Sequence, residues 1–242
     1  MKPIIGIPLR YDHLKDERPI LYIGETVRRT IQRAGGEVFT LTPVQDVEYI
    51  NTKGNEFSEL TAEEKLIINK NLDKCDGLFL PGGMKFTPYD RYILDYAIEH
   101  KIPTLAVCLS MQMMSCYQED VVLEKNETTI NHKQEDDLKL THKVYVNKNS
   151  KLFKILEKEE LMVNSFHNYH ATKNHIYEVS ATSEDGVIEA IEYPSNFFNI
   201  GVQWHPEISY NFDEDSKKII DAFIDSAKSF SEEKLNKVYI EN

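Results

Sequence analysis

Residues 104–112, Thr-Leu-Ala-Val-Cys-Leu-Ser-Met-Gln, pass from an apolar run through a cysteine into a helix-forming stretch. The run 102–107 is typical of a buried strand. The small residues Ala106 and Ser110 leave room for a sharp strand-to-helix turn, which would present Cys108 at the edge of a sheet. A helix N-terminus stabilises a thiolate, the reactive form of cysteine. A lone cysteine after a strand is also often a small buried hydrophobe, so this stretch alone leaves both readings open.

Strand-like and helical segments alternate on both sides of this turn. Apolar runs predict strands at 3–8, 38–41, 77–80, 161–164, 186–192 and 199–204. Helical spacing is found at 25–34, 60–72, 89–100 and 215–230, the first of these closed by Gly35-Gly36. This alternation indicates βαβ crossovers, and therefore an α/β fold with a mostly parallel central sheet flanked by helices. The polar stretch 119–151 predicts a small antiparallel excursion at one edge.

Length and composition limit the classes of protein. The chain has 242 residues and no repeat of 20 to 50 residues, so we expect a single domain over residues 1–242. Its 28 Lys and Arg against 40 Asp and Glu give a net charge of −12, which disfavours nucleic acid as a partner. No apolar run is long enough for a membrane span. Three cysteines without CxxC spacing argue against a disulfide scaffold, so we expect a cytoplasmic protein.

Two further segments carry candidate chemistry. In Gly201-Val-Gln-Trp-His-Pro-Glu207, extended geometry before the proline places Glu207 beside His205, so the carboxylate can orient the imidazole. By itself such a pair is more often a structural ion pair. In Leu80-Pro-Gly-Gly83, two glycines after a strand allow backbone N–H groups to approach a ligand, as an oxyanion hole requires. Alone, this segment fits a tight turn equally well.

Taken together and in order, five segments resemble the class I glutamine amidotransferase-like superfamily. They are GLFLPGG (77–83), AVCLSMQ (106–112), VNSFHNYH (163–170), DGVIEAIE (185–192) and GVQWHPE (201–207). Within the superfamily the chain is similar to the γ-glutamyl hydrolase branch, peptidase C26. That branch is favoured by IIGIPLRYD (4–12), PYDRYILDYAIE (88–99), THKV (141–144) and NSFH (164–167). The resemblance spans residues 3 to 210 and implies a flavodoxin-like sheet.

The resemblance also implies a cysteine hydrolase that cleaves the γ-glutamyl amide bond of a small molecule through a γ-glutamyl thioester and releases glutamate. Cys108 would be the nucleophile, His205 the acid and base, and Glu207 its orienter. The N–H groups of Gly83 and Leu109 would form the oxyanion hole. The substrate side would be lined by Gln112, which seats the γ-glutamyl group, and by Ser165 and His167. The resemblance implies no metal or organic cofactor, and a homodimer is the default assembly.

Some residues depart from the family pattern. Ala106 and Ser110 stand where the family usually has glycine; both are small, but the Ser110 side chain is expected to crowd the region where the backbone approaches substrate. Leu109 and Met84-Lys85 stand where members of the branch that act on polyamine derivatives carry other residues, which leaves the leaving amine open. His167 and His170 have HxxH spacing but no evident third ligand, so no metal site is expected. Two alternatives remain, a glutaminase subunit that supplies ammonia to a synthase and a catalytically impaired binding or regulatory homologue.

Overall fold

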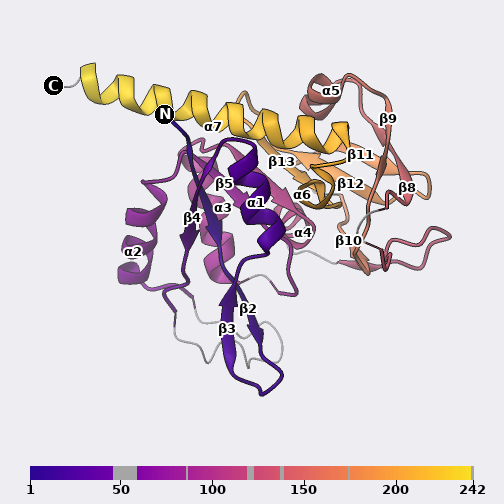
Figure 1. Ribbon diagram of the computed structural model, residues 1–242, viewed down its shortest axis with the longest axis horizontal. Coiled ribbons are helices and arrows are strands. Elements are labelled where there is room, and N and C mark those ends of the chain that lie inside the picture. Colours follow the sequence, from indigo (N-terminus) through magenta and orange to yellow (C-terminus); the bar gives the residue numbers. More distant parts are fainter. Residues whose placement is uncertain (46–58, 86, 119–122, 137–138, 174, 241–242) are drawn as a thin grey trace.

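The computed structural model describes residues 1–45, 59–85, 87–118, 123–136, 139–173 and 175–240. A nine-stranded sheet runs through the molecule (Figure 1). Its strands, in spatial order, are β4 (Glu37–Leu41), β1 (Ile4–Pro8), β5 (Gly77–Leu80), β6 (Thr104–Val107), β13 (Asn199–Val202), β12 (Ile188–Glu192), β11 (Glu178–Ser183), β8 (His142–Val146) and β9 (Glu160–Val163). The predicted α/β class with a central sheet flanked by helices is therefore confirmed.

The sheet has a parallel part and an antiparallel part. β4, β1, β5, β6 and β13 pair in parallel, whereas the ladders from β13 through β12, β11 and β8 to β9 are antiparallel. The antiparallel part is wider than the small edge excursion expected from 119–151, because only β8 of its four strands comes from that stretch. Two short ladders lie outside the sheet. They are β2 (Arg10–His13) with β3 (Pro19–Tyr22), and β7 (Glu124–Lys125) with β10 (Tyr169–His170).

Helices cover both faces of the sheet (Figure 1). One face packs on α1 (Glu25–Arg33), α5 (Lys151–Leu156) and α7 (Glu214–Ile240), and the other packs on α2 (Ala62–Leu72), α3 (Pro88–Glu99) and α4 (Leu109–Ser115). Side chains of β6 alternate between the two cores, Leu105 and Val107 on the first and Ala106 on the second. The sixth helix, α6 (Pro206–Ser209), follows β13.

The helix ends follow from local sequence. Thr61 caps α2 through a reciprocal pair with Glu64, and Thr87 caps α3 by accepting from the Asp90 amide. Gly35, with φ of 100°, follows the end of α1 as predicted. The last helix is longer than the expected 215–230. In the described part of the chain, no helix has the length and apolar character needed to cross a membrane.

Candidate active site

Cys108 occupies a strained turn between β6 and α4. Its backbone has φ of 53° and ψ of −111°, a region that residues other than glycine rarely adopt. The amide of Cys108 donates to Val202 O at 2.8 Å, which continues the parallel ladder between β6 and β13 through the turn. The residue is 9% exposed, so the strain presents the thiol at the sheet edge without placing it in bulk solvent.

The other two cysteines have a different environment. Burial raises the pKa of Cys75 to about 12 and that of Cys116 to about 11. Both therefore remain neutral thiols at physiological pH, and a thiol is a much weaker nucleophile than a thiolate. All three cysteines are free in the structure, and of the three, Cys108 is the one that directly follows a strand of the sheet.

His205 and Glu207 lie at the end of the neighbouring strand. Because β13 pairs with β6 in parallel, with Val202 opposite Val107, residues just after both strands meet at the same sheet edge. His205 Nδ1 lies 2.7 Å from Glu207 Oε1. Glu207 is buried at the start of α6, so its carboxylate fixes the imidazole orientation.

The backbone of His205 is anchored from β9. Asn164, just after that strand, donates through Nδ2 to His205 O at 2.8 Å and accepts from the His205 amide at the same distance. The Phe166 ring packs edge-on against the imidazole, with 5.4 Å between ring centroids. These contacts hold the backbone of His205 in place and pack a ring against its imidazole.

The charge state of His205 depends on its two neighbours. Burial alone would lower the pKa of His205, but the Glu207 carboxylate and the Cys108 sulfur together hold that pKa well above its usual value. The arrangement therefore favours a protonated imidazole, which can act as a proton donor beside Cys108.

The loop after β5 forms the wall opposite the histidine. A Cβ atom on Gly82 would lie 3.0 Å from His205 Cε1 and 3.4 Å from Cys108 Cβ, and one on Gly83 would lie 3.2 Å from Leu109 Cδ2. A side chain at either position would therefore crowd these neighbours. The predicted oxyanion residues Gly83 and Leu109 are thus neighbours beside the nucleophile.

Arg10, which the sequence analysis did not single out, orients this loop. Arg10 Nη2 donates to Pro81 O at 2.7 Å, and Arg10 Nε donates to Gly82 O at 3.1 Å. In a trans peptide the carbonyl and the following N–H point in opposite directions. Holding the two carbonyls on the Arg10 side therefore turns the amides of Gly82 and Gly83 to the other side. Asp90, at the start of α3, forms a buried ion pair with the guanidinium.

Ser110 belongs to the same network. Its hydroxyl donates to Pro81 O at 2.8 Å and accepts from Arg10 Nη2 at 2.8 Å. The residue is fully buried, so its side chain joins α4 to the loop after β5. These hydrogen bonds hold the Ser110 hydroxyl toward Pro81 and Arg10.

The three predicted substrate-side residues are buried and already hydrogen-bonded. Gln112 Nε2 donates to Tyr169 O at 2.7 Å and to Gln203 Oε1 at 3.1 Å. Ser165 Oγ donates to His132 O at 2.7 Å, and His167 Nδ1 lies 3.0 Å from Tyr169 O. Alternation explains this pattern, since Asn164 and Phe166 contact His205 while the residues between and after them face the opposite way. Their contact with substrate stays a prediction.

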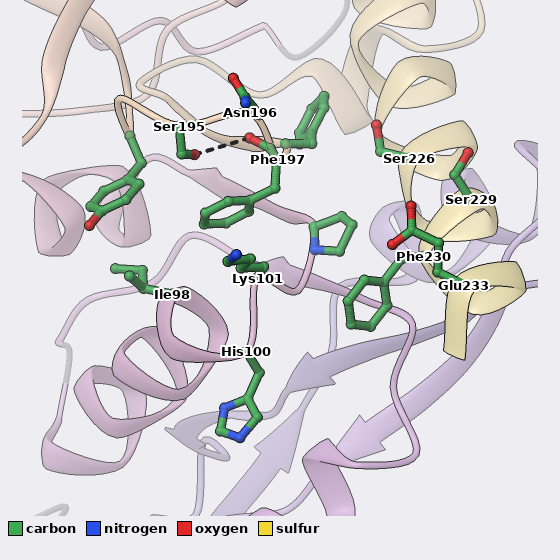
Figure 2. A pocket seen from close by; sticks show the side chains of 13 residues that line it. Ile98, His100, Lys101, Ser195, Asn196, Phe197, Ser226, Ser229, Phe230 and Glu233 are labelled. Atoms are coloured by element: carbon green, nitrogen blue, oxygen red, sulfur yellow. Dashed lines mark hydrogen bonds between the residues drawn. The ribbon is translucent and has the colours of Figure 1, made fainter. Parts of the chain in front are cut away.

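One of two cavities lies beside the candidate active site, and the other lies at the opposite end of the strands. The larger, about 640 Å³, is lined by Lys101 and Pro103 before β6 and by Phe230 and Glu233 of α7 (Figure 2). It lies at the amino end of β6, opposite Cys108, whereas ligands of parallel sheets bind at the carboxyl ends. The smaller, about 210 Å³, is lined by residues that include Arg10, Met84 and Thr87 and therefore adjoins the glycine loop.

The chain matches a protein-family model, proteins of related sequence and solved structures. The peptidase C26 family model matches residues 87–207, half of the chain. Protein NtpR of Enterococcus hirae is 25% identical, over 93% of this chain and 99% of its own. The γ-glutamyl-γ-aminobutyrate hydrolase PuuD of Escherichia coli K12 is 25% identical, over 71% of this chain and 79% of its own. The structure resembles the glutaminase domain of Trypanosoma brucei CTPS with bound acivicin, with a TM-score of 0.61, 18% identity and 94% coverage of each chain.

Proposed function

Because the chain belongs to the peptidase C26 family of hydrolases, we propose that it cleaves the γ-glutamyl amide bond of a small molecule and releases glutamate. The observation that carries the proposal is the strained Cys108 beside a histidine–carboxylate pair at adjacent ends of parallel strands. The name of the PuuD relative supports the substrate class. Strands from both halves of the chain form one sheet, so we treat residues 1–242 as one hydrolase domain.

In the proposed first step, the Cys108 thiolate attacks the carbon of the γ-amide. The new C–S bond converts the carbonyl oxygen into an oxyanion, which the amides of Gly83 and Leu109 stabilise. The His205 imidazolium donates its proton to the amide nitrogen as the C–N bond breaks, and the free amine departs. A γ-glutamyl thioester on Cys108 remains.

In the second step, water resolves the thioester. Neutral His205 takes a proton from water, whose oxygen attacks the thioester carbon. The C–S bond then breaks, glutamate leaves, and the thiolate–imidazolium pair is restored. Glu207 keeps the imidazole in the tautomer and orientation that both steps need. These steps balance without a metal or an organic cofactor.

The leaving amine would lie on the side of the glycine loop. The cavity of about 210 Å³ beside Arg10 is bounded by the β2–β3 hairpin and by residues that include Met84, Lys85 and Thr87. We propose that it receives the amine portion of the substrate, because Met84 and Lys85 directly follow Gly83. The segments expected to set specificity, 84–89 and the stretch after 119, include residues 86 and 119–122, which lie outside the described residues.

A glutaminase that supplies ammonia to a synthase is the second candidate. The likeness to the glutaminase domain of Trypanosoma brucei CTPS favours it, since that domain has the same fold. The two candidates differ in substrate, because a glutaminase hydrolyses glutamine itself, and in the need for a partner chain.

Glutamate release from a panel of γ-glutamyl amides, with glutamine included, tests the proposal. We expect selective release from one class of amide, and a loss of at least about 1,000-fold in Cys108→Ala. Cys75→Ala is the matched control, because Cys75 is a buried cysteine outside the site and its removal should leave the rate unchanged. Circular dichroism confirms that both variants fold.

The outcomes separate the alternatives. Preference for glutamine over every substituted amide would favour the glutaminase. Equal rates for Cys108→Ala and wild type would contradict nucleophilic catalysis by this residue. Tight binding of a γ-glutamyl amide without release would identify a binding homologue.

A further inference from the structure

Three histidines and one carboxylate converge in the interior, in a group that the proposed reaction does not use. This histidine cluster consists of His132, His142, His167 and Glu189. The four side chains come from four separate segments: the loop after β7, the start of β8, the segment after β9, and β12. Each side chain is at most 3% exposed.

The distances within the cluster match a tetrahedral metal site. Glu189 Oε1 lies 3.2 Å from His132 Nδ1, 3.6 Å from His142 Nε2 and 3.7 Å from His167 Nε2. Ligand atoms about 2.0–2.1 Å from a tetrahedral zinc ion are about 3.3–3.4 Å apart. The ligand atoms of His132, His142 and Glu189 all lie within 4.8 Å of one another. His167 Nε2 lies outside this group of three but near the same Glu189 oxygen, and is the candidate for a fourth donor.

These atoms have no hydrogen bond that would explain their convergence. Among the described residues, none is in hydrogen-bonding geometry with His132 Nδ1, His142 Nε2, His167 Nε2 or either Glu189 oxygen. Burying a carboxylate and three ring nitrogens in this way is costly unless a cation lies between them.

In each of the three histidine rings, the nitrogen that faces away from Glu189 lies near a hydrogen-bond acceptor. His132 Nε2 lies 3.0 Å from Asp185 Oδ2, and His142 Nδ1 lies 3.3 Å from Lys143 O. His167 Nδ1 lies 3.0 Å from Tyr169 O. A cation bound beside Glu189 would need the lone pair of each inner nitrogen, and these outer acceptors can hold the proton on the other nitrogen of each ring. His167 Nδ1 also lies 3.2 Å from Asn126 Nδ2. The same outer partners orient the histidine ligands of metal sites.

We propose that the histidine cluster holds a structural divalent cation, for which zinc is the best match. Three imidazoles and one carboxylate are a donor set that zinc accepts, and four protein ligands leave no open position for catalysis. The ion would tie β8 and β12 to the segment after β9. That segment includes Asn164, which anchors the His205 backbone, so the ion would support the active site through this segment.

Metal content measured in the Cys108→Ala background tests the site. This background prevents zinc from binding the Cys108–His205 pair and being counted. We expect about one zinc per chain after dialysis against metal-free buffer, and a lower Tm after chelation that zinc restores. Cobalt substituted for zinc should give the intense visible absorption of a tetrahedral ion.

Single substitutions then identify the ligands. His142→Gln and Glu189→Gln should each weaken zinc affinity at least about 100-fold, and Asp185→Asn about 10- to 100-fold. His100→Gln is the matched control, since His100 stacks on Tyr96 at the end of α3 and should bind zinc as the parent does.

Two results would overturn the proposal. One is a parent protein that binds no zinc at micromolar concentration and melts at the same temperature with and without it, as expected if protons alone stabilise the cluster. The other is an equal loss in His100→Gln and His142→Gln, which would place the zinc on the surface. Should the ligand variants fail to fold, the zinc titration and cobalt spectrum of the parent still decide. Neither measurement depends on hydrolysis of a γ-glutamyl amide.

Discussion

Glu207 is the residue on which the proton chemistry of the site depends. Its carboxylate lies 2.7 Å from His205 Nδ1 and is foremost among the contacts that raise the pKa of that imidazole. A pKa above the usual 6.5 keeps His205 protonated and able to donate to the leaving amine at neutral pH. The proton is lost as pH rises through this raised value, so kcat/KM should fall on the alkaline side there.

Glu207→Gln should therefore change both the pH profile and the rate. Without the carboxylate, burial dominates and the pKa of His205 falls, so the alkaline limb of kcat/KM should move down by about one to three pH units. The maximal rate should fall about 100- to 10,000-fold, because the imidazole loses its orienter. Rates on the best γ-glutamyl amide between pH 5 and 10 measure both effects. An unchanged alkaline limb would show that another group sets it.

At the scale of elements, the active site is a junction of the loop after β5, the turn before α4 and the start of β2. Arg10 joins all three through the carbonyls of Pro81 and Gly82 and the hydroxyl of Ser110. An arginine can make these three contacts at once because the N–H groups of its planar guanidinium donate in several directions. The orientation of the Gly83 amide is thus determined by a side chain more than 70 residues earlier.

Arg10→Lys tests this positioning role. Lysine keeps a positive charge beside Asp90, so the buried carboxylate stays paired, but it cannot reach both carbonyls at once. We expect kcat to fall about 10- to 100-fold with little change in KM, because oxyanion stabilisation acts in the transition state. Arg18→Lys, in the exposed pair with Asp16, is the control and should behave as wild type. A rise in KM alone would instead indicate a direct contact with substrate.

The sequence predicts those features that depend on residues close together along the chain. Alternating apolar runs predicted the strands around Cys108, and the Gly35-Gly36 stop predicted the end of α1. The Arg10 network was not predictable, because it joins positions that only the folded sheet brings together. The same holds for the histidine cluster, whose ligands His142, His167 and Glu189 lie in three segments of the family resemblance without any metal-binding spacing. Local spacing in the sequence points only to His167 and His170, and of these only His167 belongs to the histidine cluster.

For the whole molecule, α7 supports one face of the sheet. Phe223 on this helix is fully buried, with ring centroids 6.5 Å from Phe79 and 5.7 Å from Phe198. A Cβ atom on Gly77 would lie 2.8 Å from Ala227 Cβ, so helix and strand are in close contact. The helix lies along the sheet (Figure 1), and its packing therefore stabilises β5 together with the residue that precedes β13.

Phe223→Ala should destabilise the protein without changing the chemistry. Removing a fully buried aromatic ring leaves a cavity, and we expect the free energy of unfolding to fall by about 3–5 kcal/mol, measured by urea denaturation. Phe212→Ala is the control, because Phe212 is 48% exposed and should change stability by less than about 1 kcal/mol. At temperatures where both variants stay folded, kcat should match wild type, since the ring packs on Phe79 and Phe198 in the core. A lower kcat in the folded Phe223→Ala protein would show that α7 packing also positions the turn at Cys108.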